Sequence, residues 1–145
     1  MHPCIVLLAL LRAARLIHHT AHHIASGPSF AADHALYAEL YEALDDEIDT
    51  LSEKAVYMSA PIDAADLAER VAQLTQRLSP TGARTNPDAL AKRALEVERA
   101  IQEGISATRQ TLDEMGALSY GLDNFLAGLA DSHEKALYLL SRRTL

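Results

Sequence analysis

The stretch Leu16–Met58, LIHHTAHHIASGPSFAADHALYAELYEALDDEIDTLSEKAVYM, decides the fold. From its fifteenth residue onward, apolar and aromatic positions alternate in steps of four and three: Phe30, His34, Tyr37, Tyr41, Leu44, Ile48, Leu51, Ala55 and Met58. A 3.5-residue repeat held over four heptads predicts one long amphipathic helix. Gly27 and Pro28 separate this helix from the apolar segment before it. The stretch therefore predicts two helices joined by a tight turn.

Two histidines and two carboxylates of this stretch are candidate metal ligands, here called the candidate quartet: His22, His34, Asp49 and Glu53. Imidazole nitrogen together with carboxylate oxygen suits iron and related divalent metals. Asp49 and Glu53 are four residues apart, so they lie on one flank of the second helix. His22 can reach His34 because the Gly-Pro turn folds the first helix back on the second. The two histidines and the two carboxylates together match the ligand set of such a metal site.

The spacing also predicts that one chain cannot complete the site. His34 precedes Asp49 by 15 residues, which is roughly 22 Å along a helix at about 1.5 Å per residue. Two copies of the second helix that cross antiparallel near Glu42 or Ala43 would bring His34 of one chain level with both carboxylates of the other. A two-fold axis then gives two identical sites per dimer. We therefore expect an obligate homo-oligomer.

The same residues carry a family resemblance. The pattern H-x-x-H-H-x-x-x-G-P-x-F-x-x-x-H spans His19 to His34, and D-T-x-x-E-K-A-V spans Asp49 to Val56. Together they resemble the Dps family of mini-ferritins. A weaker match, H-E-K-A-x-x-x-L from His133 to Leu140, resembles the end of the family's last helix. The resemblance covers the first two helices well and the last helix loosely.

The resemblance implies a function. The family's inter-subunit ferroxidase ligands fall on the candidate quartet, which implies oxidation of Fe(II), preferably by hydrogen peroxide, with iron in the site or zinc in its place. Twelve copies built from two-fold dimers would form a hollow shell that stores the Fe(III) mineral and protects against oxidative stress. The alternative is a non-catalytic shell or structural assembly with a vestigial metal site. Imidazoles bind metal only when neutral, so activity should fall below roughly pH 6.

The length and composition of the whole chain limit which folds and functions are possible. Its 145 residues are enough for a single domain, 1–145. With 13 Lys and Arg against 20 Asp and Glu, the net charge is −7, so DNA binding is not expected. The lone Cys4 excludes an internal disulfide and suits the cytoplasm. The apolar run Cys4–Leu11 is too short to span a membrane.

Start and stop signals divide the chain into helices. The first is expected from Pro3 to about Ala25, with Ile5, Leu8 and Leu16 facing inward. The second runs to about Met58 and is capped by Ser29. The rest are a shorter helix at Asp63–Leu78, a third long helix that starts at Asn86-Pro87-Asp88 and ends by Gly116, and a fourth at Ser119–Arg142. Together they predict an all-α, ferritin-like four-helix bundle with a short extra helix in the long connection between helices two and three.

The remaining polar residues have competing interpretations. His19 and His23 either orient hydrogen bonds near the candidate quartet or line an interface. His18 is expected at the surface or an interface, and Glu47 is expected among the solvated acids of the second helix. His133 lies on an apolar stripe and is interpreted as a core or interface histidine with satisfied hydrogen bonds.

Several features depart from the Dps pattern. Many members have Trp where this chain has His23, and this chain has no Trp at all. The lysine-rich tail through which many members bind DNA is absent. The family's acidic iron entrance corresponds to Gly116–Leu122, which carries no acid, so Asp123 is the nearest carboxylate. No E-x-x-H occurs, which argues against an ordinary ferritin with its site inside one bundle.

Overall fold

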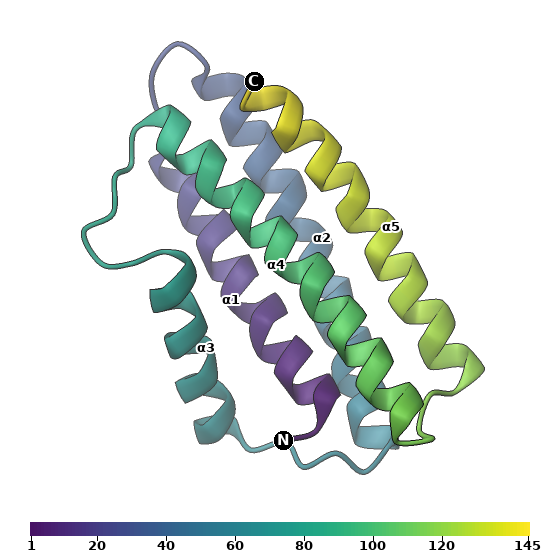
Figure 1. Cartoon of the computed structure of the whole chain (residues 1–145). Coiled ribbons are helices and arrows are strands. Elements are labelled where there is room, and N and C mark those ends of the chain that lie inside the picture. The colour runs from purple at the N-terminus through teal and green to yellow at the C-terminus, as the bar shows by residue number, and fades with distance from the viewer.

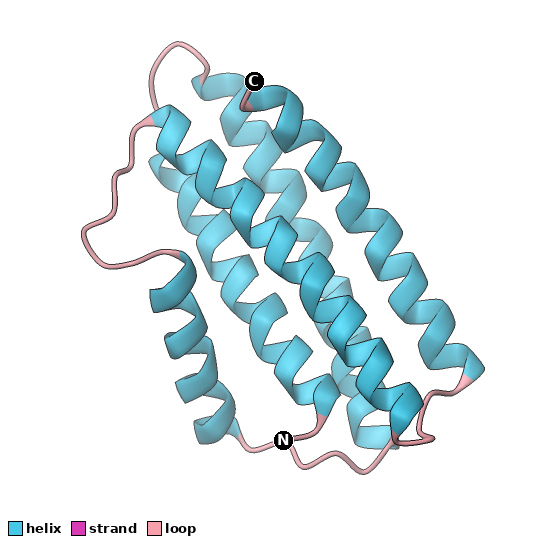
Figure 2. Cartoon of the chain, in the orientation of Figure 1, coloured by secondary structure: helices cyan, strands magenta, loops and turns pink.

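The computed structural model describes all 145 residues and contains five helices and no strand. Four long helices run side by side, as Figure 1 shows, and loops join them in Figure 2. They are α1 (Pro3–Ile24), α2 (Phe30–Tyr57), α4 (Pro87–Glu114) and α5 (Tyr120–Arg143). The short α3 (Ala64–Leu78) lies against α1 at the side of the bundle. The predicted all-α architecture is confirmed, including the short helix in the long connection.

The long connection sets the topology. α3 returns along the length of the bundle, so α4 starts at the same end as α2 and runs in the same direction (Figure 1). α1 is the central element, because it packs against α2, α3 and α4. By length and composition α1 could cross a membrane, but 67% of its most apolar window is buried inside the bundle. It is the core helix of this fold.

Local chemistry fixes most helix ends. Asn86 accepts a hydrogen bond from the backbone N–H of Ala89, and Asp63 and Ser119 cap α3 and α5 in the same way. Ser29 was predicted to cap α2, and it does not. Its hydroxyl donates to Asp33 instead, at 2.9 Å, and makes no capping hydrogen bond. The competing carboxylate one turn away explains this difference.

The buried face of α1 also differs from the prediction beyond its midpoint. Ile5 and Leu8 face inward as expected, but Leu16 is exposed. Ile17 and His18 are buried in its place. The inward stripe continues as Leu11, Ala14, His18 and Ala21, steps of three and four that keep one face of the helix toward the core. The prediction followed the large apolar side chain of Leu16, although small alanines mark the buried face.

Candidate metal site

The turn between α1 and α2 places His22 beside His34. Gly27 adopts a φ of +85°, a left-handed conformation that suits glycine, and Pro28 follows it. Arg143, at the end of α5, holds the start of α2 by donating hydrogen bonds to both carboxylate oxygens of Asp33, at 2.8 and 3.0 Å. These hydrogen bonds from Arg143 lower the pKa of Asp33. Since Asp33 directly precedes His34, the ion pair helps to fix the position of the second ligand.

The imidazole of His22 and that of His34 each form a hydrogen bond with the backbone carbonyl of the other residue. Nδ1 of His22 lies 2.7 Å from the carbonyl oxygen of His34, and Nδ1 of His34 lies 2.7 Å from the carbonyl oxygen of His22. The two rings stack with centroids 3.7 Å apart and planes inclined by 18°. A carbonyl oxygen can only accept, so each Nδ1 must carry the proton and donate it.

This arrangement fixes the tautomer of both rings. With Nδ1 protonated, a neutral imidazole has its lone pair on Nε2. A metal-binding histidine characteristically donates its other ring N–H to a carbonyl or carboxylate, which sets its tautomer and orientation. Both histidines of the candidate quartet are therefore prepared to offer Nε2 to a cation.

More aromatic groups surround the pair. The ring of His23 lies 5.3 Å from that of His22, and the ring of His19 lies 4.5 Å from that of His23. The ring of Tyr41 lies 4.4 Å from that of His19 and 5.3 Å from that of His22. Burial, followed by the repulsion of His23, lowers the pKa of His19. Tyr41 is thus the one tyrosine in contact with the histidine cluster.

The two carboxylates of the candidate quartet lie elsewhere on α2. Asp49 and Glu53 are both exposed, and neither makes a hydrogen bond or ion pair within the chain. Asp49 borders a surface groove between α1 and α2 together with Arg12 and Asp45. Within one chain, no three His, Cys, Asp or Glu residues converge closely enough to hold a metal ion. One chain therefore brings together the two histidines but not the two carboxylates.

The nearest acid to the expected iron entrance is engaged in an ion pair. Asp123 accepts a hydrogen bond from Nε of Arg109 at 2.8 Å. Its charge is thereby partly neutralised.

Comparison with known proteins bears on the fold. No protein-family model and no curated protein matches the sequence. The X-ray structure of Dps from Thermosynechococcus elongatus matches 99% of this chain and 90% of its own, with a TM-score of 0.82 and 18% identity. The Dps protein from Vibrio cholerae O1, described as a member of a broad superfamily of ferritin-like diiron-carboxylate proteins, matches 99% of this chain and 87% of its own, with a TM-score of 0.82 and 16% identity.

This chain has the Dps fold. The match spans all five helices, so the resemblance inferred from the first two helices extends to the whole architecture.

Within this Dps fold, the sequence prediction missed a polar cluster in the bundle interior, here called the core network: His18, Glu47, Glu98 and His133. Each of the four long helices contributes one residue. Nε2 of His18 lies 2.8 Å from Oε1 of Glu98. His133 bridges the two glutamates, with Nδ1 2.5 Å from Oε2 of Glu98 and Nε2 2.9 Å from Oε2 of Glu47. The core network forms a polar layer between two separate apolar clusters of the core.

Charge accounts for the stability of this layer. Burial alone would raise the pKa of Glu98, but the hydrogen bonds from His133 and His18 outweigh burial and place the pKa at about 2. Burial alone would lower the pKa of His133, but its hydrogen bonds to Glu47 and Glu98 raise the pKa to about 10. His133 is therefore an imidazolium that donates to a carboxylate on each side.

The core network corrects two predictions and confirms one. His18 is fully buried rather than at the surface, and Glu47 is mostly buried rather than solvated. His133 is a buried histidine with satisfied hydrogen bonds, as predicted. The sequence did carry a signal, because each residue continues the apolar stripe of its helix: Ala94, Glu98 and Ile101 on α4, and Leu44, Glu47 and Leu51 on α2.

Proposed function

We propose that this protein is a ferroxidase that stores iron. Two chains pair through antiparallel α2 helices, so that His22 and His34 of one chain meet Asp49 and Glu53 of the other. Fe(II) is the substrate bound there, and hydrogen peroxide is the oxidant. Twelve such chains enclose a cavity in which Fe(III) is deposited as mineral.

The reciprocal hydrogen bonds between the imidazoles and backbone carbonyls of His22 and His34 carry this proposal. These hydrogen bonds use Nδ1 of both rings and leave both Nε2 lone pairs free for a metal. Packing of the two rings alone would not require this arrangement. Carboxylates complete the set because anionic oxygen best matches Fe(III) as it forms. Zn(II) accepts the same donors and is the competing occupant.

The proposed reaction uses two Fe(II) ions for each hydrogen peroxide molecule. Two Fe(II) ions give one electron each to one hydrogen peroxide molecule, whose O–O bond breaks. Both oxygen atoms enter the product with oxygen from water as two FeO(OH) units, and four protons are released. No further oxidant is required. The reaction consumes both reactants from which hydroxyl radicals would otherwise form.

Removal of the two carboxylates tests the proposal. The double variant Asp49→Ala/Glu53→Ala should bind Fe(II) weakly and lose at least about tenfold in the rate of Fe(III) formation after a peroxide pulse. The matched control is Asp131→Ala/Glu134→Ala, which removes two exposed acids three residues apart on α5, away from the proposed α2 contact. Rates are followed by Fe(III) absorbance after anaerobic loading.

Particle size must be measured on the same samples by light scattering. Rapid oxidation in the wild type and the control, but not in the double variant, supports the ferroxidase. Equal and slow oxidation in all three proteins, with the assembly intact, would refute catalysis and leave the non-catalytic shell.

A further inference from the structure

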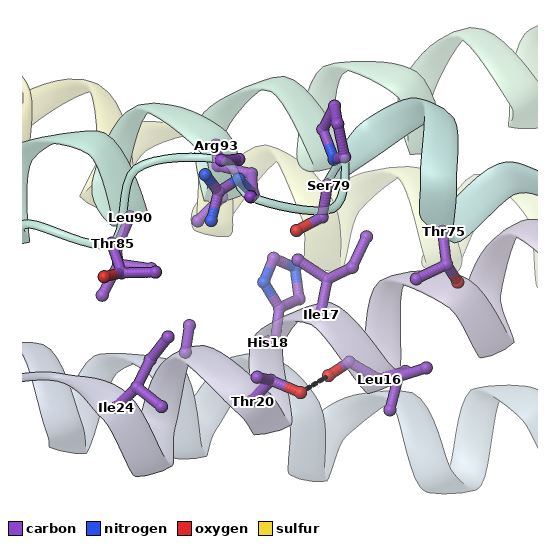
Figure 3. Close-up of a pocket in the computed structure, with 15 residues that line it drawn as sticks. Leu16, Ile17, His18, Thr20, Ile24, Thr75, Ser79, Thr85, Leu90 and Arg93 are labelled. Carbon is purple, nitrogen blue, oxygen red and sulfur yellow. Dashed lines mark hydrogen bonds between the residues drawn. The ribbon is translucent and has the colours of Figure 1, made fainter.

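Away from the candidate quartet, a second, fully buried histidine borders a cavity. A cavity of about 310 Å³, here called the α1–α4 pocket, lies between α1, the end of α3, the α3–α4 connection and the start of α4 (Figure 3). Its volume is at the lower end of the range of small-molecule sites, about 300–1,000 Å³. A ligand of this pocket would be small.

His18 gives the pocket an unusual polar group. The side chain is fully buried, and its Nε2 is held by the carboxylate of Glu98 at 2.8 Å. Since that carboxylate is ionised and accepts, the imidazole tautomer that fits this contact has its proton on Nε2. Nδ1 is then a hydrogen-bond acceptor, and it has no partner in the chain. Figure 3 shows the His18 ring extending from α1 toward Ser79 and Arg93.

A buried acceptor without a partner costs free energy unless a donor reaches it. Most such groups in folded proteins are paired. The unpaired Nδ1 is therefore a feature that a ligand can satisfy, and a side chain fixed by a carboxylate behind it is well suited to bind one.

The rest of the lining indicates the kind of ligand. More of the exposed wall is apolar than polar, and leucine and isoleucine side chains such as Ile24 and Leu90 form part of it. No acid lines the pocket, although the chain has 20. The one cationic side chain, Arg93, already donates from Nη2 to the carbonyl of Arg84 at 2.7 Å. These walls favour an apolar body over a cation.

We propose that the α1–α4 pocket binds a small, uncharged organic molecule with an apolar body and one hydroxyl group, whose hydroxyl donates a hydrogen bond to Nδ1 of His18. The hydroxyl oxygen can accept in turn from Ser79 or Arg93, which both line the pocket. Glu98 positions the ring by holding Nε2. This binding does not involve the candidate quartet and requires no iron.

Paired probe molecules test the hydrogen bond directly. Phenol and anisole have the same aromatic body, but only phenol carries a hydroxyl donor. Calorimetric titration of the iron-free full-length protein at pH 8 should show saturable binding of phenol at one site per chain. Anisole should bind at least about tenfold more weakly, because it leaves Nδ1 unpaired. Benzoate, as an anionic probe, should also bind more weakly than phenol.

A blocking variant tests the location. Ala83 lines the pocket from the connection, so Ala83→Phe should fill it and abolish phenol binding. The control is Arg84→Phe, which adds the same ring at the next, exposed position outside the lining. Loss in the first variant alone supports the proposal. Absence of saturable phenol binding, equal affinity for anisole, preference for benzoate, or unchanged binding in Ala83→Phe would each overturn it.

Discussion

At the scale of single residues, the orientation of His34 makes a sharp prediction. Its Nδ1 is committed to the carbonyl of His22, so its contribution to iron binding comes from Nε2 alone. His34→Gln keeps a polar side chain but removes this nitrogen. Peroxide-driven oxidation should fall by about 10- to 100-fold, measured by stopped-flow absorbance. His2→Gln, at the opposite end of α1, is the control and should keep the wild-type rate. An unchanged rate in an intact His34→Gln assembly would exclude His34 as a ligand.

The second prediction for a single residue concerns Tyr41 as an electron donor beside the histidine cluster. The chain lacks Trp, and the Tyr41 ring contacts the histidine cluster, with the guanidinium of Arg15 5.5 Å from its centroid. A phenol can supply an electron to a stray oxidant, whereas the ring of phenylalanine cannot do so readily. Tyr41→Phe should keep the rate of iron oxidation and increase the radical signal detected by spin trapping. Tyr138→Phe, on the exposed face of α5, should change neither. Equal radical signals in both variants would remove this role.

The candidate site was only partly predictable from these residues. The sequence spacing and the Gly-Pro turn were enough to bring His22 and His34 together, because both effects are local along the chain. The core network was not predicted, because it joins residues up to 86 positions apart and depends on how four helices face each other. Glu98 received no assignment from the sequence, although its position on the stripe of Ala94 and Ile101 indicates a buried side chain.

At the scale of helices, the ion pair of Asp33 with Arg143 joins the start of α2 to the end of α5. Asp33 is almost fully buried and Arg143 is partly buried. Breaking the pair leaves Asp33 without its bidentate partner, so Arg143→Gln should lower the free energy of unfolding by about 1–3 kcal/mol. Arg142→Gln, an exposed neighbour without such a pair, is the control and should change it by less than about 0.5 kcal/mol. Urea unfolding measures both, and equal effects would contradict this role.

Helix boundaries were the most predictable part of the fold. The five observed helices begin and end within about one or two residues of the predicted positions. Proline, glycine and Asn86 act on their own neighbours, so they can be interpreted without the tertiary structure. The rotation of each helix was less predictable. Leu16 was assigned to the core, but the packing of α1 against three helices buries its small-residue face instead.

At the scale of the whole molecule, the proposed site requires two chains. Ala38 lies one turn after His34 on the same face of α2, close to the expected crossing point. Ala38→Arg would insert a bulky charge on both sides of the two-fold axis. We expect smaller particles by light scattering, loss of iron oxidation and unchanged helical circular dichroism. Ala107→Arg, at an exposed position of α4, should retain size and activity. Full oxidation by dissociated Ala38→Arg chains would refute the shared site.

The core network also makes the stability of the whole bundle depend on pH. Glu98 has a folded-state pKa of about 2, below its ordinary 4.5, so its contribution is complete above pH 4.5 and is lost as the pH falls through about 2. His133 has a folded-state pKa of about 10, above its ordinary 6.5, so its contribution is complete below pH 6.5 and is lost as the pH rises through about 10. The combined contribution should therefore be greatest between these two ordinary values.

Urea unfolding from pH 3 to pH 10 measures this dependence. In the wild type, the free energy of unfolding should be highest near pH 5–6 and decline on both sides. Glu98→Gln removes the carboxylate that two histidines share, so it should lower the maximum by about 3–5 kcal/mol and flatten the curve. Glu96→Gln, at an exposed site on the same helix, should preserve the wild-type curve. The core network is the buried polar layer to which all four long helices contribute. If the free energy of unfolding of Glu98→Gln depends on pH as strongly as that of the wild type, the charges of this layer do not stabilise the bundle.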